Sequence, residues 1–393
     1  MIYVHIPFCR SFCTYCDFYS EVAVRCRKDE QIRQQEELFG HFADALVAEV
    51  KLRGCEFSDD THTLYIGGGT PSVLPLRVFR RLLSALEDVG CCGPYEEFTV
   101  EVNPEDIVEN GIPYVKGLLE LGVNRISMGV QSFDDDVLKF MNRRHDARTA
   151  REAYSILEAA GVKNISIDLI FGLPQLSDDQ WKDTLDKALH ISASGIPPRH
   201  ISAYQLSVEP GSMLAKLVEK GRFEEASEEL CEHQYSILCE ALSQAGYRHY
   251  EISNFAQPGY EAVHNSAYWR HVPYVGLGPG AHSYSTEGRC HCNTLARPAV
   301  RQWNLPDLHA YIADPASVQE SETLDEEQLV LEKIMLALRT DEGIAASFLE
   351  EHCDPHSLQR ALEAGNLIRT TSGMYRIPEE RFFVSDNVIT SII

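Results

Sequence analysis

The residues with the clearest capacity for chemistry are three cysteines near the start of the chain, Cys9, Cys13 and Cys16, in the stretch "YVHIPFCRSFCTYCDF". Their CxxxCxxC spacing does not fit a zinc ribbon, which needs a second pair of ligands at suitable spacing. Three thiolates on one loop can instead ligate three irons of a [4Fe–4S] cluster and leave the fourth iron open to another ligand. The alternative is three ordinary buried cysteines. We predict a cluster site in this loop.

Further polar and glycine-rich segments follow other apolar runs of the sequence, namely "GGGTPS", "EVNPE", "GVQSF", "DLIFGLP" and "YQLSVEPG". The glycines of Gly67–Ser72 would let a ligand approach the backbone without obstruction by a Cβ atom, although a tight turn could need the same residues. In parallel barrels the chemistry lies at the carboxyl ends of the strands. The cysteine loop and these five segments therefore predict one shared site.

The elements that must position these loops alternate between β-rich and helical patterns. Helix-like periodicity occurs in segments such as Phe42–Leu52, Val78–Val89 and Ala147–Ala160, and Gly161 is a helix stop signal. This alternation predicts an α/β fold with a parallel sheet. Periodicity leaves open whether the sheet is a partial barrel or an open doubly wound sheet. The six candidate strands begin at Tyr3, Thr63, Glu97, Asn124, Asn164 and Arg199.

Composition narrows the class of protein. The 393 residues are 44% hydrophobic, which suffices for a large core, and the net charge of −24 argues against a nucleic-acid partner. Met1 leads directly into "IYVHI" without the features of a signal peptide, and no apolar run approaches the ~20 residues of a membrane span. The twelve cysteines are then expected to be reduced. These features predict a cytoplasmic protein.

The pattern changes twice along the chain, which predicts three parts. Residues 1–210 would form the strand–helix domain, and residues 211–297 an extension that carries the segment "HNSAYW". Within it, residues 246–293 are rich in Tyr, His, Gly and Asn. Residues 298–393 would form a small, mostly helical, winged-helix-like domain with a hairpin around Gly373. With seven basic against 17 acidic residues, this last part is expected to pack against the main domain rather than to read DNA.

The cysteine spacing after a first strand, followed by "GGGTPS", resembles the radical S-adenosylmethionine (SAM) superfamily. In that superfamily SAM chelates the open iron, and an electron from the cluster cleaves SAM to a 5′-deoxyadenosyl radical. The motifs "YVHIPFC", "YIGGGTPS", "RISMGVQSF", "MNRRH", "IDLIFGLP", "YEISNFA", "HNSAYW" and "GLGPGAHSY" resemble the branch of oxygen-independent coproporphyrinogen III dehydrogenases and HemW-type haem chaperones. The resemblance covers nearly the whole chain and implies a partial (β/α)6 TIM-like barrel.

The resemblance also implies roles for individual residues. The cluster ligands would be Cys9, Cys13 and Cys16. The SAM methionyl end would lie beside Tyr3, Gly68, Gly69 and Thr70. Its carboxylate and ribose would contact Glu101, Gln131, Arg143 and Asp168, and its adenine would contact Ile170 and Ala203. The histidine of the family's HNxxYW motif, a proposed haem-iron ligand, corresponds to His264.

Two features of this sequence favour the chaperones over the dehydrogenases. The dehydrogenases have a Cys-x-Cys pair at the third cysteine, whereas Phe18 occupies the place of the second cysteine here. They also have a longer segment ahead of the first strand. His264 offers an imidazole for haem iron, and Tyr268 and Trp269 offer flat apolar surface to a macrocycle. A structural histidine is the alternative. We also take Cys91, Cys92 and the "CHC" segment at residues 290–292 as structural.

The resemblance therefore implies a haem chaperone that binds a [4Fe–4S] cluster, SAM and haem. Its expected partners are haem-acceptor proteins such as respiratory enzymes, and an electron donor such as flavodoxin or ferredoxin. One alternative is an oxygen-independent coproporphyrinogen III oxidase. Another is a SAM-binding enzyme that acts on an unrelated small substrate, with "HNSAYW" as a structural segment.

Overall fold

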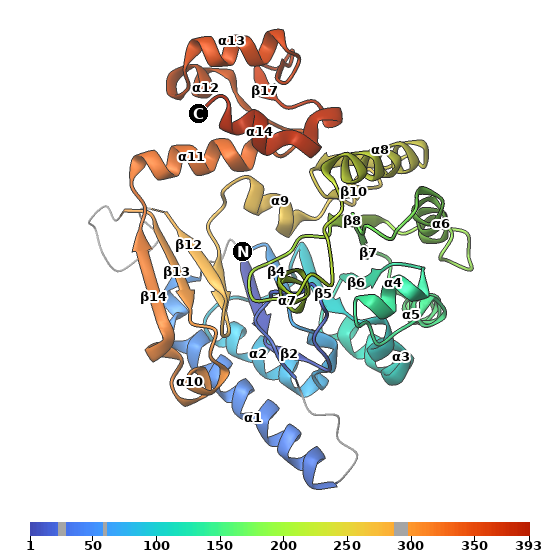
Figure 1. The fold of residues 1–393 in the computed structure, drawn as a ribbon. Coiled ribbons are helices and arrows are strands. Elements are labelled where there is room, and N and C mark those ends of the chain that lie inside the picture. Colours follow the sequence, from blue (N-terminus) through green and yellow to red (C-terminus); the bar gives the residue numbers. More distant parts are fainter. Residues whose placement is uncertain (23–28, 58–60, 287–297) are drawn as a thin grey trace.

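The computed structural model describes residues 1–22, 29–57, 61–286 and 298–393. Its centre is a nine-stranded sheet with the order β11-β1-β4-β5-β6-β7-β8-β10-β9 (Figure 1). Strands from both halves of the chain therefore meet in one sheet.

The middle of this sheet confirms the predicted strands and their parallel arrangement. Each strand pairs in parallel with the next one along the chain, as the βα alternation requires. The six strands are β1 (Ile2–Ile6), β4 (Thr63–Gly68), β5 (Glu97–Val102), β6 (Arg125–Gln131), β7 (Ile165–Phe171) and β8 (His200–Gln205). Residues from all six strands line one cavity, so they form a partial barrel rather than an open doubly wound sheet.

Three later strands extend the sheet at its two edges. β11 (Val275–Leu277) pairs in parallel with β1. At the other edge β10 (Asn254–Ala256) pairs antiparallel with β8, and β9 (Arg248–Glu251) pairs antiparallel with β10. Each edge of the parallel run is thus covered by a strand from the second half of the chain, which removes an unpaired row of backbone groups.

Helices connect the strands, and one of them ends at Gly161, where the sequence signal predicts. Gly161 closes its helix in the left-handed conformation, with φ 104°, and Ser177 begins the next helix with a capping box. The first eight helices are α1 (Asp29–Leu52), α2 (Leu76–Asp88), α3 (Pro104–Glu120), α4 (Asp135–Phe140), α5 (Ala147–Ala160), α6 (Asp178–Leu189), α7 (Met213–Glu219) and α8 (Glu228–Gln244).

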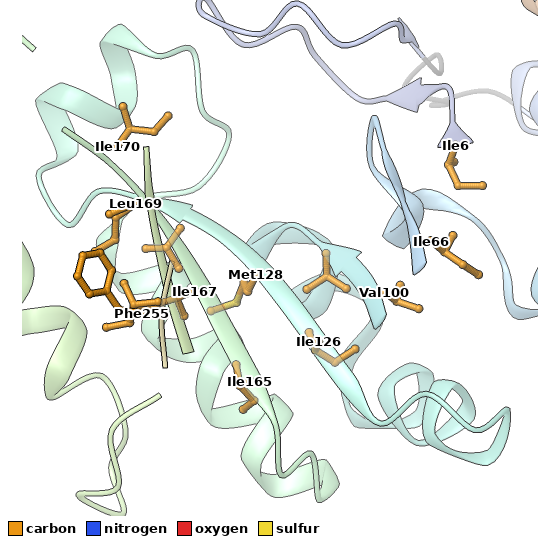
Figure 2. Packing of buried hydrophobic residues seen from close by; sticks show 14 of the residues in the cluster. Ile6, Ile66, Val100, Ile126, Met128, Ile165, Ile167, Leu169, Ile170 and Phe255 are labelled. Carbon is orange, nitrogen blue, oxygen red and sulfur yellow. The ribbon is translucent and has the colours of Figure 1, made fainter. Parts of the chain in front are cut away.

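The core lies on both faces of the parallel strands. All seven residues of β6 are buried, as expected for a central parallel strand. Figure 2 shows Ile126 and Met128 of this strand beside Val100 of β5 and Ile167 of β7. Burial of each such side chain contributes about 1.5–3 kcal/mol, so the strands form a stable frame for the loops that follow them.

A second layer packs against α1. It is a three-stranded sheet of β12 (His282–Ser285), β13 (Val300–Asn304) and β14 (Gln319–Thr323), with α10 (Leu308–Ala313) beside it. A two-stranded pair, β2 (Phe8–Cys9) and β3 (Glu21–Val22), flanks the cysteine loop.

The C-terminal part contains the predicted short helices and a hairpin at Gly373, whose φ is 82°. Its small sheet has the order β15-β17-β16. The elements are α11 (Glu326–Ala337), β15 (Ile344–Ala345), α12 (Ala346–His352), α13 (Pro355–Glu363), β16 (Ile368–Arg369), β17 (Met374–Arg376) and α14 (Ser385–Thr390).

The short helix α9 (Val263–Trp269) lies at the amino ends of the barrel strands, between them and the C-terminal elements (Figure 1). The backbone N–H groups of Val263 and His264 donate to the carboxylate of Glu97, the first residue of β5. The cysteine loop follows the carboxyl end of β1. The two segments with the strongest chemical signals therefore lie at opposite ends of the barrel.

Candidate functional site

The barrel encloses a cavity of about 630 Å³ that runs between these two ends. Cys9, Cys13 and Cys16 line one end, and His264 and Tyr268 of α9 line the other. The lining includes most of the residues expected to bind SAM, namely Tyr3, Gly68, Gly69, Thr70, Glu101, Gln131, Arg143, Asp168 and Ile170. Ala203 is buried at 1% exposure and is not part of this lining.

The cysteine loop is held by hydrogen bonds from distant segments. The side-chain amide of Asn142 donates to the carbonyl of Phe12 at 2.7 Å, and the N–H of Leu214 donates to the carbonyl of Thr14 at 2.7 Å. The N–H of Thr14 donates to the carbonyl of Met141 at 3.1 Å. These contacts place the three partly exposed thiols beside the cavity without any disulfide between them.

The glycine motif supports the cysteine loop directly. The N–H of Gly69 donates to the carbonyl of Ile6 at 2.8 Å, and that of Thr70 donates to the carbonyl of Phe8 at 2.7 Å. A Cβ atom on Gly69 would lie 2.7 Å from the carbonyl oxygen of Phe8 and 3.1 Å from the Sγ atom of Cys9. Only glycine fits at this position. The sequence suggested that the small glycines make room for a ligand, whereas the structure shows that Gly69 makes room for the cysteine loop.

Two buried carboxyl groups face the middle of the cavity. Glu101 accepts hydrogen bonds from the hydroxyl of Tyr65 at 2.7 Å and from the N–H of Gly68 at 3.1 Å. Burial, together with the charge of Asp168, raises the pKa of Glu101 to about 7. Asp168 accepts from the hydroxyl of Ser127 at 3.2 Å, and burial raises its pKa as well. Both groups can accept hydrogen bonds from ligand hydroxyls such as those of a ribose.

Arg143 connects the cysteine loop to the strands. Its Nη1 donates to Sγ of Cys13 at 3.4 Å, and its Nη2 donates to the side chain of Asn103 at 2.6 Å and the carbonyl of Gly129 at 2.7 Å. Its buried Nε has no hydrogen-bond partner within the described residues. This donor can bind a further acceptor, such as a ligand carboxylate.

Gln131 and Tyr3 complete this part of the lining. Gln131 ends β6 with a φ of 67°, a left-handed conformation that costs about 1–3 kcal/mol in a residue other than glycine. Such strain at a cavity is typical of a functional position. The hydroxyl of Tyr3 hydrogen-bonds Nδ1 of His5 at 3.0 Å.

His264 is buried at the inner end of the cavity, at 1% exposure. Its Nδ1 lies 2.8 Å from the hydroxyl oxygen of Thr63, and its Nε2 lies 3.2 Å from that of Tyr268. Burial lowers the pKa of His264 to about 3, so the imidazole is neutral and able to ligate a metal. Thr63 begins β4 and Gly68 ends it, and five steps of ~3.3 Å separate the two by roughly 16 Å.

The other histidines of this region lie elsewhere. His249 is stacked on Phe255, with ring centroids 4.1 Å apart, and His271 is stacked on Tyr284 at 4.3 Å. His282 lies beside Trp303. None of these three lines the cavity. The segment at residues 290–292 lies outside the described residues.

Sequence reasoning missed several polar residues of the inner cavity, among them Arg125 and His200. His200 contacts the hydroxyls of Ser166 and Tyr250, each at 2.8 Å, and Arg125 begins β6. Both sit at the start of apolar strand runs, where a charged or titratable residue is uncommon. Their position at the start of a strand is the feature of the sequence that could have identified them as cavity residues.

The geometry fits a [4Fe–4S] cluster better than a single metal ion. Within the described residues no three His, Cys, Asp or Glu side chains converge as the ligands of one ion would. A four-iron cluster offers a separate iron to each thiolate, so its ligands need not converge on one point. The unpaired Nε of Arg143 fits a SAM carboxylate beside the cluster.

No helix in the described part of the chain combines the length and the apolar character needed to cross a membrane.

Comparisons with known proteins show which family and which relatives this chain is similar to. The family model of the radical SAM superfamily matches residues 3–188. The chain is 34% identical over 342 residues to heme chaperone HemW of Synechocystis sp., with 87% of this chain and 78% of that protein covered. It is 31% identical over 381 residues to heme chaperone HemW of Bacillus subtilis, with 95% and 94% covered.

A relative from Danio rerio, the mitochondrial radical S-adenosyl methionine domain-containing protein 1, is 30% identical over 388 residues, with 97% of this chain and 82% of that protein covered. Among solved structures, coproporphyrinogen III oxidase (HemN) of Escherichia coli, a radical SAM enzyme, matches with a TM-score of 0.75 at 20% identity. The match covers 99% of this chain and 89% of that one. At this identity the likeness shows a common fold.

Proposed function

This chain belongs to the HemW family of radical SAM proteins, and from that premise we propose that it is a haem chaperone. In this proposal it binds a [4Fe–4S] cluster through Cys9, Cys13 and Cys16, holds SAM beside the cluster, and binds haem. It then passes the haem to acceptor proteins such as respiratory enzymes.

The observation that carries the proposal is the continuous cavity with thiols at one end and a neutral imidazole at the other. The thiol end has the donors that a SAM molecule needs, and the cluster would supply electrons to its sulfonium. Arg143, through Nε, and the carboxyl groups of Glu101 and Asp168 would orient SAM, with Ile170 as an apolar wall. Flavodoxin or ferredoxin is the proposed class of electron donor.

At the other end, His264 would ligate haem iron through Nε2. Its Nδ1 is held by the hydroxyl of Thr63, which fixes the ring, as a partner on the second nitrogen does for other metal-binding histidines. Nε2 contacts only the hydroxyl of Tyr268 within the described residues, at 3.2 Å, so ligation requires the loss of one long hydrogen bond.

A haem titration under anaerobic conditions tests this proposal. His264→Ala should shift the absorption spectrum of the haem complex and weaken haem binding, because the axial ligand is lost. His190→Ala is the matched control, since His190 is exposed and its side chain contacts Asp186 of the helix that it ends. If wild type and His264→Ala gave identical spectra and affinities, His264 would not be the ligand. A wild-type protein without haem affinity would exclude the chaperone function.

The alternative is an oxygen-independent coproporphyrinogen III oxidase, which the fold shared with HemN favours. Phe18 occupies the position of that enzyme class's fourth cysteine, and its side chain is 65% exposed at the cavity. The reconstituted protein should be incubated anaerobically with coproporphyrinogen III, SAM and a reductant. We expect no protoporphyrinogen, whereas its formation over many turnovers would establish the enzyme and reject the chaperone.

A further inference from the structure

Arg125 is a buried cation at the inner part of the cavity that the proposed cofactor contacts do not use. Its side chain is 3% exposed and it lines the cavity. Its Nε has no hydrogen-bond partner, and its guanidinium forms no ion pair within 4.0 Å, among the residues that the structure describes. A guanidinium in this condition is unusual, because taking an ion out of water costs several kcal/mol unless it is paired.

The nearest carboxylates are already engaged with other donors. Glu97 attracts Arg125 electrostatically, but its oxygens accept from the N–H groups of Val263 and His264 at 2.8 and 3.2 Å. Asp168 also attracts Arg125, but it accepts from the hydroxyl of Ser127. The guanidinium therefore keeps donors that face the cavity.

His200, which also lines this part of the cavity, does not compete with Arg125 for an anion. Burial lowers the pKa of His200 well below its usual range, so its ring is neutral near pH 7. The phenols of Tyr65 and Tyr250 also face this cation. A buried arginine with an unpaired Nε, near a neutral histidine and two phenols, is suited to bidentate binding of a carboxylate.

We propose that Arg125 binds a ligand carboxylate in an inner chamber of the cavity, lined by Arg125, His200, His264 and Tyr268. Arg125 begins β6 and Gln131 ends it, so six steps of ~3.3 Å separate the backbones of these two residues by roughly 20 Å. Because Arg125 starts from the strand end opposite the cysteine loop, we assign the carboxylate to a second ligand rather than to SAM. Resting on the proposed function, that ligand is haem, whose propionates are carboxylates.

The test compares Arg125→Gln with wild type, using haem, haem dimethyl ester, SAM and decarboxylated SAM as probes of the anaerobic, cluster-loaded protein. Wild type should bind haem about 10- to 100-fold more tightly than the ester, because the esterified propionates cannot form a charge-assisted hydrogen bond with Arg125. Arg125→Gln should bind haem as weakly as wild type binds the ester, and should bind SAM normally. Arg125→Lys should be intermediate, since lysine lacks the planar fork.

Two controls separate binding from folding. Arg148→Gln changes an exposed arginine of α5 and should leave all affinities unchanged. Arg125→Gln should not lower the thermal stability of the ligand-free protein, because the buried cation has no partner there. A large loss of stability would show a structural role and overturn the proposal.

The outcomes separate this inference from the proposed function. If Arg125→Gln left all four affinities unchanged, the guanidinium would bind none of these ligands and the proposal would fail. If it weakened binding of SAM but not of decarboxylated SAM, the carboxylate site would stand with SAM as its source. If wild type bound no haem, the chaperone function would fail, and the SAM comparison would still decide the role of Arg125.

Discussion

Glu101 shows how burial can move the titration of a carboxyl group to near-neutral pH. Its carboxyl is buried at the cavity and is held by Tyr65 and by the N–H of Gly68. The folded pKa of about 7 lies above the ordinary 4.5, so the folded chain binds this proton more tightly than the unfolded chain. The associated stabilisation is present below pH 4.5 and is lost as the pH rises through about 7.

Glu101→Gln should remove this dependence in the ligand-free protein. Between pH 5 and pH 8 the free energy of unfolding of wild type should fall by roughly 2–3 kcal/mol relative to that of the variant, since each pKa unit corresponds to ~1.4 kcal/mol. Urea denaturation at several pH values measures this difference. Parallel pH profiles for the two proteins would contradict the raised pKa of Glu101.

Cys13→Ala should affect cofactor content rather than folding. The Cys13 thiol is partly exposed and makes side-chain hydrogen bonds with Arg143 and Tyr15, so its loss removes little packing. We expect a three-iron or labile cluster and no SAM cleavage, with an unchanged circular dichroism spectrum. Iron and sulfide analysis after anaerobic reconstitution measures the first effect, and Cys92→Ala, at an exposed cysteine, is the control. A full cluster in Cys13→Ala would remove this cysteine as a ligand.

Among the elements, those with strong local signals were predictable. β4 and β7 are short runs rich in β-branched and aromatic residues, and α5 ends at Gly161, so their existence followed from sequence pattern. The three-residue strands β10 and β11 carry no such signal, because their positions are set by the edges of a sheet that residues far away in the chain build. The same holds for Arg125, whose lack of a partner is a property of the folded cavity.

The glycine motif offers a test of how one element supports another. Gly69→Ala should displace the cysteine loop, because the added Cβ would lie 2.7 Å from the carbonyl oxygen of Phe8 and 3.1 Å from Sγ of Cys9. We expect a reduced iron content and a loss of stability of about 1–3 kcal/mol, as for other overpacked sites.

Gly40→Ala is the matched control for this change. Gly40 lies within α1, and a Cβ atom added there would meet no atom within 4 Å beyond its chain neighbours and the backbone of its own helix, so alanine should stabilise the helix by about 0.5–1 kcal/mol. Iron analysis and thermal unfolding of both variants make the comparison. Normal iron content in Gly69→Ala would show that the loop adjusts to the extra carbon.

At the scale of the whole molecule, a single buried carboxylate joins parts of the chain that are more than 200 residues apart. Glu49 of α1 accepts from the N–H of Gly278 at 2.9 Å, the side-chain amide of Asn304 at 2.8 Å and the hydroxyl of Tyr311 at 2.6 Å. Arg53 lies 3.5 Å from the same carboxylate. This network attaches the layer of β12–β14 and α10 to the barrel.

Glu49→Ala should therefore destabilise the whole fold by about 3 kcal/mol, because it leaves three buried donors and the buried cation of Arg53 without this acceptor. Glu36→Ala is the control, since Glu36 lies on the same helix and its ion pair with Arg77 is exposed, which is worth at most about 1 kcal/mol. Urea denaturation followed by both fluorescence and circular dichroism measures the two losses. One cooperative transition at lower urea is expected for Glu49→Ala, because the second layer and the barrel share this contact. Equal stabilities of the two variants would mean that the apolar contacts between the layers suffice without the network.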